Sequence, residues 1–402
     1  MKRNSFLAAF LIAALCGFAG SSPAASEPAP IVVGSLFPLT GTVAVGGHTS
    51  QQGVEQAVAD INAHGGIKSL GGAKIKLVSR DSTSDPAGAA DAAARLIDDV
   101  HPIAIIGCYA SGLSVTASSV AERRGIPFIT MSFSDELTSR GYKNIFQVAP
   151  LASAIGVKQL SYAAAIAAKA GQPLKNIAIV YENTPYGTAQ AEGLKKEADR
   201  QHINVVLYEE YAQGLTDATP LVQKIVSSGA QVLFPMSLYT DAVLLIRGLA
   251  QRHSKVQIVG GSGGFVIPAF FEAARSLSEG VMSINSSNYD TYGKFEKVYN
   301  AKYHTFAPHE TFENAICMYV VRAALEASKA TTPAALRAAL AVLNVKGGDF
   351  AGMPGGGIKF NAVGLNTLAY PIMVQWRHAN LVTVWPAAKG TQKAAWNGKL
   401  IK

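Results

Sequence analysis

The run Gly260-Gly261-Ser262-Gly263-Gly264 has the residues of a catalytic motif. It matches the Gly-x-Ser-x-Gly nucleophile elbow, in which a serine sits on a sharp strand-to-helix turn, and it follows an apolar run that predicts a strand. Glycine-rich runs match this pattern easily, and Pro268 interrupts the helix that should begin directly after the serine. The run lacks both the Gly-Lys-Ser/Thr of a phosphate loop and the dinucleotide spacing. We therefore expect this chain not to be an enzyme.

Other residues capable of chemistry are dispersed. The chain has eight histidines and three cysteines, with no His-Glu-x-x-His or Cys-x-x-Cys, and Cys16, Cys108 and Cys317 lie far apart. This spacing is not typical of a metal cluster or a disulfide framework. We expect no metal and no cofactor. Because triad partners need not be adjacent in sequence, catalysis by Ser262 stays open as an alternative, which labelling by a fluorophosphonate would reveal.

Two strand-to-helix junctions point instead to binding. Residues 31–36 predict a buried strand, followed by a Pro/Gly turn, a glycine-rich loop at Gly46-Gly47 and an amphipathic helix through residues 56–58. Such a junction leaves free backbone N–H groups at the helix start, where they can hold an anionic or polar ligand. Ser111 lies at a similar junction, where its hydroxyl can help to hold a carboxylate; the alternative is a helix N-cap serine.

The alternation of strand and helix continues along the chain. Apolar runs between amphipathic helices predict parallel strands covered on both faces. The predicted strands cover residues 74–79, 102–107, 126–130, 146–148, 176–181, 205–211, 231–235 and 256–260. The predicted helices cover residues 86–100, 111–124, 152–170, 185–201, 219–228 and 240–252. These two series predict an α/β fold with two doubly wound lobes, closed by a helix-rich stretch and a C-terminal hairpin.

The N-terminus has the form of an export signal. Lys2 and Arg3 precede an apolar run over residues 6–18 that is too short to span the ~30 Å hydrocarbon layer as a helix, and small residues follow it. We predict a signal peptide over residues 1–25, cleaved on export to the periplasm; an N-terminal membrane anchor is the alternative. The formal net charge is +8, but the charges are scattered. We therefore expect no nucleic-acid partner.

Five motifs, in order along the chain, resemble the leucine/isoleucine/valine-binding class of periplasmic solute-binding proteins, the type I two-lobed receptors of ABC importers. The motifs are Phe37-Pro38-Leu39-Thr40-Gly41, Ile61-Asn62-Ala63-His64-Gly65-Gly66-Ile67, Arg80-Asp81-Ser82-Thr83-Ser84-Asp85-Pro86, Glu136-Leu137-Thr138-Ser139-Arg140-Gly141-Tyr142 and Glu182-Asn183-Thr184-Pro185-Tyr186-Gly187. The resemblance extends from about residue 31 to residue 386.

The resemblance implies two parallel-sheet lobes joined by a three-strand hinge. Lobe 1 would comprise residues 31–147 with 285–367, and lobe 2 residues 148–284 with 368–402. A small molecule would bind in the cleft, and closure would favour a form that a membrane permease recognises. The expected partners are therefore a carboxylate or amino-acid ligand and the ABC permease of the inner membrane, and we expect a monomer.

For lobe 1, the resemblance implies ligand contacts from two loops. Ser111 and the backbone N–H of Gly112 would hold a carboxylate, and Ser132 and Ser134 would add donors from the end of the next strand. Ordinary turn serines are the alternative for the second pair. Tyr109 is a further candidate that could equally pack beside the hinge.

For lobe 2, Tyr186 and Tyr239 match positions that cover the body of the ligand, since an aromatic ring offers a large apolar face with a polar tip. The alternative for each is a half-buried surface tyrosine. Gly46 departs from the family, many of whose members have an aromatic residue there that packs on the ligand. Its absence predicts a larger pocket.

Ser262 is the second departure. Amino-acid binders of this class usually have a carboxylate at this position that pairs with the α-ammonium of the ligand. Burying an ammonium without an opposite charge costs on the order of several kcal/mol. A standard amino-acid ligand is therefore in doubt unless a neighbouring acid substitutes, the candidates being Glu182, Asp241 and Asp135.

The sequence thus predicts a solute-binding component of an ABC importer. We place hydrophobic or aromatic carboxylates slightly ahead of branched-chain-type amino acids as ligands, with amides third. The alternative function is a ligand-sensing domain on the same scaffold, similar to amide or amino-acid receptors. Such modules lack an export signal or continue into a membrane or signalling segment, so we expect a free exported binding protein.

Overall fold

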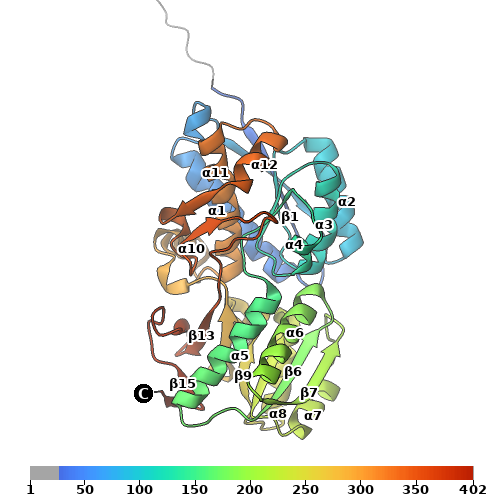
Figure 1. Ribbon diagram of the computed structural model, residues 1–402, viewed down its shortest axis with the longest axis vertical. Coiled ribbons are helices and arrows are strands. Elements are labelled where there is room, and N and C mark those ends of the chain that lie inside the picture. Colours follow the sequence, from blue (N-terminus) through green and yellow to red (C-terminus); the bar gives the residue numbers. More distant parts are fainter. Residues whose placement is uncertain (1–26, 402) are drawn as a thin grey trace, which may run out of the picture.

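The computed structural model describes residues 27–401, so the signal peptide predicted over residues 1–25 lies outside the described part of the chain. Two lobes lie one above the other along the long axis of the molecule (Figure 1). Among the described residues, no helix has both the length and the apolar character needed to cross a membrane.

Lobe 1 is built on a five-stranded parallel sheet with the strand order β2-β1-β3-β4-β5. Its strands are β1 (Ile31–Phe37), β2 (Ile75–Asp81), β3 (Ile105–Gly107), β4 (Phe128–Thr130) and β5 (Ile145–Gln147). Helix α1 packs along α11, and α2 packs along α3 on the other side of the sheet (Figure 1). The helices of this lobe are α1 (Ala44–Ala63), α2 (Pro86–Val100), α3 (Ser111–Arg123), α4 (Glu136–Ser139), α10 (Lys294–Tyr303), α11 (His309–Ser328) and α12 (Pro333–Ala341).

Lobe 2 is built on a seven-stranded sheet with the order β14-β13-β10-β9-β8-β6-β7. Its parallel part consists of β6 (Asn176–Glu182), β7 (Asn204–Tyr211), β8 (Val232–Met236), β9 (Gln257–Gly260) and β10 (Met282–Asn285). The hairpin of β13 (Ile372–Arg377) and β14 (Asn380–Trp385) joins β10 in antiparallel orientation. The helices are α5 (Ala152–Lys169), α6 (Pro185–Arg200), α7 (Thr219–Ser227), α8 (Tyr239–Gln251) and α9 (Pro268–Ala274).

The sequence of β6 shows why this sheet is covered on both faces. Successive side chains of a strand point to opposite faces, and every residue of β6 after Asn176 is buried. Ile177 and Ile179 belong to the core that includes α5 and α6, whereas Ala178 and Val180 belong to the core beneath α7, α8 and α9. A strand inside this sheet therefore needs a continuous run of apolar residues, because both of its faces are buried.

Two helices that lead into the candidate site have strong N-terminal signals. The side chain of Thr184 accepts a hydrogen bond from the N–H of Gly187, and Pro185 occupies the first turn of α6. Asp85 and Pro86 do the same for α2, with the N–H of Gly88 as donor. Because caps satisfy otherwise unpaired N–H groups, these residues fix where each helix begins.

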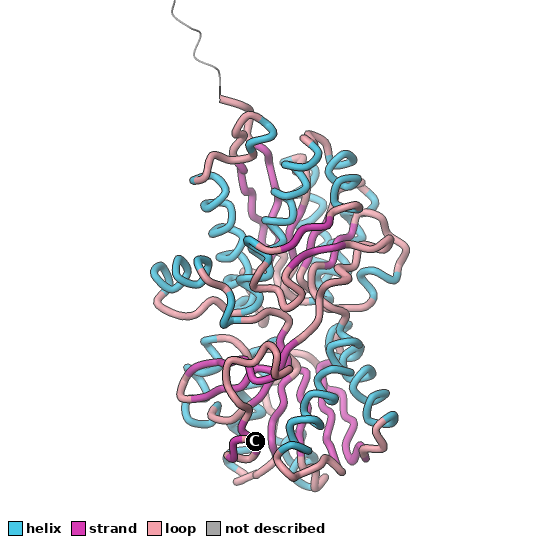
Figure 2. Tube along the Cα trace, turned by 60° about the vertical axis from the view of Figure 1, so that its left-hand side comes forward, coloured by secondary structure: helices cyan, strands magenta, loops and turns pink. Residues whose placement is uncertain are grey.

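Three crossings join the lobes, between β5 and α5, between β10 and α10, and before β13; Figure 2 shows chain passing between the lobes near the middle of the molecule. Asn366 ties the first and third crossings together. Its N–H donates to the carbonyl of Gln147 at 2.9 Å, and its side-chain Nδ2 donates to the carbonyl of Val148 at 3.0 Å. Its Oδ1 accepts from the N–H groups of Lys359 and Leu368.

The fold class predicted from the sequence is confirmed, with two doubly wound parallel-sheet lobes joined by three crossings. One local prediction was wrong. Gly46 and Gly47 do not form a loop, because α1 begins at Ala44 and contains both. A Cβ on Gly47 would lie 1.8 Å from the carbonyl oxygen of Pro38. Glycine at this position therefore lets the first turn of α1 pack closely against the turn that contains Pro38. The strand β10 was not predicted at all.

We expect Asn366→Ala to lower the free energy of unfolding by about 2 kcal/mol or more, since it leaves a buried carbonyl and two N–H groups without partners. The matched control is Thr367→Ala, because the Thr367 hydroxyl bonds the carbonyl of Lys359 at an exposed site. Urea unfolding of both variants checks this. Similar losses in the two variants would mean that Asn366 does not stabilise the hinge.

Candidate ligand-binding site between the lobes

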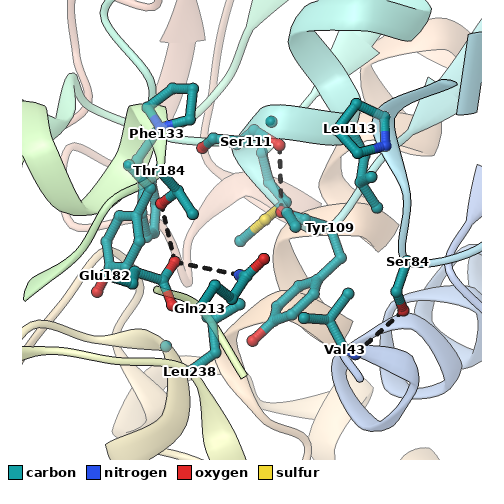
Figure 3. Close-up of a pocket in the computed structure, with 18 of the residues that line it drawn as sticks. Val43, Ser84, Tyr109, Ser111, Leu113, Phe133, Glu182, Thr184, Gln213 and Leu238 are labelled. Atoms are coloured by element: carbon teal, nitrogen blue, oxygen red, sulfur yellow. Dashed lines mark hydrogen bonds between the residues drawn. The ribbon is translucent and has the colours of Figure 1, made fainter. Parts of the chain in front are cut away.

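A pocket lies between the lobes at the carboxyl ends of the strands. Its empty volume is about 830 Å³, which includes part of the open solvent at its mouth. Figure 3 shows the residues around it. Of the residues predicted to bind ligand, the following line the pocket: Tyr109, Ser111, Gly112, Ser132 and Tyr186. Ser134, Tyr239 and Ser262 do not line it.

The lobe 1 wall includes the first turn of α3. The N-cap is Ala110, and the first intrahelical bond of this turn is from the N–H of Ser114 to the carbonyl of Ala110. The N–H groups of Ser111, Gly112 and Leu113 therefore have no partner within the helix. Together with the positive end of the helix dipole, they form a site that favours an anionic group.

The two serine loops are joined by hydrogen bonds. The Oγ of Ser111 does not cap α3 but accepts from the N–H of Ser134 at 3.2 Å. Ser132 donates to the carbonyl of Cys108 at 2.8 Å and shares a 2.6 Å contact with Ser114. Ser134 accepts from the N–H of Glu136 at 3.2 Å, which is the behaviour of a turn serine. Ser132 and Ser134 thus join the two loops, and Ser132 lines the pocket together with Ser111.

Tyr109 explains the glycine at position 46. A Cβ on Gly46 would lie 2.2 Å from the ring of Tyr109, so the ring occupies the space next to α1. Gly46 itself does not line the pocket, whereas Tyr109 does. The prediction that Gly46 enlarges the pocket is therefore not supported, because the ring of Tyr109 occupies the space beside Gly46.

The lobe 2 wall comes mainly from the junction of β6 and α6. Tyr186 donates from its hydroxyl to the carbonyl of Gly261 at 2.5 Å, and its ring lies 6.1 Å from that of Phe133 in lobe 1. Tyr186 is thus held from the β9 side while its ring contributes to the pocket. Burial raises the pKa of its phenol well above the ordinary value, so it stays neutral.

Glu182 also lines the pocket, at the end of β6. Only 1% of this residue is exposed. Burial raises the pKa of its carboxyl to about 8, and the charge of Asp241 acts in the same direction. Hydrogen bonds from Thr184, Gln213 and the backbone N–H of Leu238 oppose this rise. A shift of this size at a cleft is a recognised sign of a functional position.

Ser262 and Tyr239 lie outside the lining of the pocket. Ser262 is 1% exposed, its Oγ has no hydrogen-bond partner, and its N–H donates to Ser283 at 3.0 Å. A short 3-10 turn follows it, and α9 begins only at Pro268, so the context of a nucleophile elbow is missing. Tyr239 is the half-buried first residue of α8, and its neighbour Leu238 lines the pocket in its place.

His309 was missed by the sequence analysis. It is the first residue of α11, 1% exposed, and its ring stacks on Phe133 with centroids 6.1 Å apart. Its Nδ1 lies 3.0 Å from Oε2 of Glu310. Burial disfavours the charged imidazole, but Glu310 outweighs this and raises the pKa of His309. In the sequence, only the preceding Pro308 indicates that a helix starts here. No sequence signal indicates that His309 lies close to the end of β4.

The lobes touch across the pocket. A Cβ on Gly112 would lie 3.8 Å from Cδ of Pro185, and one on Gly214 would lie 3.6 Å from Cγ2 of Thr42. Each pair joins one residue of lobe 1 to one of lobe 2. Two hinged lobes that meet around a pocket with free N–H groups define a two-lobed ligand-binding protein.

The chain belongs to the periplasmic binding protein family, whose model matches residues 30–369. It is 32% identical over 398 residues to "Leu/Ile/Val-binding protein homolog 7" of Brucella suis, covering 95% of this chain and 96% of the relative. It is also 32% identical to "Leu/Ile/Val-binding protein homolog 8" of the same organism, covering 94% of this chain and 96% of that relative. The resemblance seen in the sequence is therefore confirmed, and a family of binding proteins supports the expectation of a non-enzyme.

Solved structures share the fold. The branched-chain amino acid transporter substrate binding protein LivJ of Streptococcus pneumoniae, in complex with isoleucine, aligns with a TM-score of 0.77 at 22% identity, covering 88% of this chain and 97% of that one. A solute binding protein of Rhodopseudomonas palustris in complex with benzoate aligns with a TM-score of 0.74 at 22% identity, covering 88% and 95%.

The close contact between Gly46 and the ring of Tyr109 predicts that substitutions at these two positions have strongly coupled effects on stability. Gly46→Ala should lower the free energy of unfolding by about 1–3 kcal/mol, because the added methyl overlaps the ring. In a Tyr109→Ala background the same change should cost less than about 0.5 kcal/mol, since the space is free. Urea unfolding of the four proteins measures the coupling. Equal costs in both backgrounds would show that the ring does not occupy this space.

Proposed function

We propose that this protein is the extracytoplasmic solute-binding component of an ABC importer. It works in the periplasm as a monomer after removal of the signal peptide, captures a small hydrophobic or aromatic carboxylate or a branched-chain-type amino acid between the lobes, and delivers it to the permease. The observation that carries the proposal is the pocket between two hinged lobes, with the unpaired N–H groups of the first turn of α3 on one wall.

The pocket chemistry suits a carboxylate with an apolar body. The first turn of α3 and Ser111 offer donors for the carboxylate. Leu113, Met131, Phe133 and Leu238 provide apolar surface around it. Isoleucine and benzoate, the ligands of the two similar solved structures, both combine a carboxylate with an apolar body, and the curated relatives are named for leucine, isoleucine and valine.

A thermal-shift screen tests the ligand class. We expect a rise in melting temperature with leucine, isoleucine, 4-methyl-2-oxopentanoate, phenylpyruvate or benzoate, because a ligand at ~100 times its dissociation constant stabilises by about 2.7 kcal/mol. No shift with any hydrophobic carboxylate or amino acid would contradict the proposal.

Ser111→Ala should weaken binding of the ligand found in that screen by roughly 1.5–3 kcal/mol, the range for a hydrogen bond to a charged group. The matched control is Ser119→Ala on the same helix, whose hydroxyl donates to the carbonyl of Val115, and neither residue lines the pocket. Isothermal titration calorimetry measures both. An unchanged affinity in Ser111→Ala would remove this hydroxyl from the site.

Binding should also favour the closed arrangement of the lobes. The lobes meet in a few small contacts, so ligand that touches both walls shifts the population toward closure. We expect the radius of gyration from small-angle X-ray scattering to fall when the ligand saturates the protein. Identical profiles with and without ligand would contradict closure.

A further inference from the structure

The sequence offers three acids, Glu182, Asp241 and Asp135, that could replace the family carboxylate missing at position 262 from a neighbouring loop. Asp241 accepts from the N–H groups of Gly214 and Leu215 at 3.1 and 2.8 Å, so both of its oxygens are in use. Asp135 accepts from the N–H and hydroxyl of Ser153. Neither lines the pocket, whereas Glu182 does.

Glu182 has one carboxylate oxygen without a partner. Its Oε1 accepts from the hydroxyl of Thr184 at 2.9 Å and from Nε2 of Gln213 at 3.3 Å, and Figure 3 shows the carboxylate between these two side chains. Its Oε2 is buried and has no hydrogen-bond partner. A buried polar atom left unpaired is unfavourable, so this oxygen requires either a proton or a donor from a bound molecule.

The two walls of the pocket are chemically opposite. Lobe 1 has N–H groups at the start of α3 that lack a partner within the helix, whereas lobe 2 has Glu182, which lines the pocket and whose Oε2 is buried without a hydrogen-bond partner. Phe133 and Leu238 lie among the residues between them. A ligand with a carboxylate at one end and an ammonium near an apolar side chain satisfies both walls, whereas a simple carboxylate satisfies only the first.

We infer that Glu182 binds the ammonium group of the ligand in place of the family carboxylate missing at Ser262, so that the pocket selects an α-amino acid over the oxo acid with the same side chain. This inference rests on the proposed function and assigns the ligand class of the same site. It reverses the order of ligands expected from Ser262 alone.

Protonation gives this selection a pH signature. At pH 7 the carboxyl of Glu182, whose pKa burial raises to about 8, is mostly neutral. Pairing with an ammonium favours the carboxylate and lowers that pKa, so binding releases a proton. Affinity for an amino acid should therefore rise by up to about tenfold per pH unit below pH 8 and level off above it. Affinity for the oxo acid should fall as Glu182 ionises.

Other titratable groups face the same region. Asp241 on α8 has a pKa raised by burial against two backbone hydrogen bonds, and the pKa values of Tyr109, Tyr186 and Tyr211 are raised well above 10. The tyrosines therefore stay neutral across the range tested. His309 lines the pocket and also titrates, so the comparison must be made between variants that differ only at Glu182.

The test is a set of calorimetric titrations of the whole mature protein and of Glu182→Gln. The ligand pairs are leucine with 4-methyl-2-oxopentanoate and phenylalanine with phenylpyruvate. We expect the unmodified protein to prefer the amino acid of the pair that it binds. Glu182→Gln should weaken amino-acid binding roughly 10- to 100-fold. Its affinity for the oxo acid should stay the same or rise.

Proton release is the second readout. Titrations with the amino acid at pH 7 in phosphate and in Tris should give different apparent enthalpies for the unmodified protein, because the buffers differ in ionisation enthalpy, and a smaller difference for Glu182→Gln. A pH dependence that persists in Glu182→Gln comes from other groups, namely His309 on the pocket wall and Glu313 on the same helix, whose pKa burial raises to about 7. Asp135→Asn is the matched control, since it removes an acid that neither lines the pocket nor acts on the pKa of Glu182; it should leave the preference between the two ligands unchanged.

The outcomes separate the two proposals. Tighter binding of both oxo acids by the unmodified protein, or an unchanged preference in Glu182→Gln, would overturn the role of Glu182 while leaving the proposed function standing. Loss of the preference in Asp135→Asn would move the role to that acid. Binding of neither member of either pair would overturn this inference and, with the wider screen negative, the proposed function. Thermal melting of each variant confirms that it is folded.

Discussion

The parallel order of the strands is the constraint on which the rest of this structure depends. Both lobes use the same order, in which the second strand of each lobe lies at one edge and the first lies beside it. Every strand-to-helix junction therefore falls on the carboxyl edge of its sheet, and the two carboxyl edges face each other. The start of α3 and the start of α6 meet because of this arrangement, and the pocket is its direct result.

Closure and ligand chemistry are coupled through buried polar groups. On the proposed closure, each polar group of the pocket that loses water without gaining a partner becomes costly. The first N–H groups of α3 and the Oε2 of Glu182 are such groups. The small apolar contacts between the lobes must offset this cost, and a ligand that pairs these groups removes it. A hinged receptor therefore gains selectivity from groups that its closed form leaves unpaired without ligand.

Much of the fold could be predicted because the signals are local. The continuous apolar run of β6 and the capping residues Asp85 and Thr184 are signals within a few residues, so they can be recognised in a single sequence. The site is different. Tyr109 lies against Gly46 through packing between distant segments, and His309 reaches the pocket from α11. Such contacts depend on tertiary packing, for which one sequence has no signal.

Tyr109 and Glu182 point to one physical reason why single positions are poor guides to a ligand. A pocket must fill its volume and pair its buried charges, but neither requirement fixes which element supplies the group. The ring that Gly46 lacks is supplied by Tyr109 from the β3–α3 junction. On our inference, the acid that Ser262 lacks is supplied by Glu182 from β6. The chemistry of such a site is therefore better judged from all the donors, acceptors and apolar surface that meet in the pocket than from one substituted position.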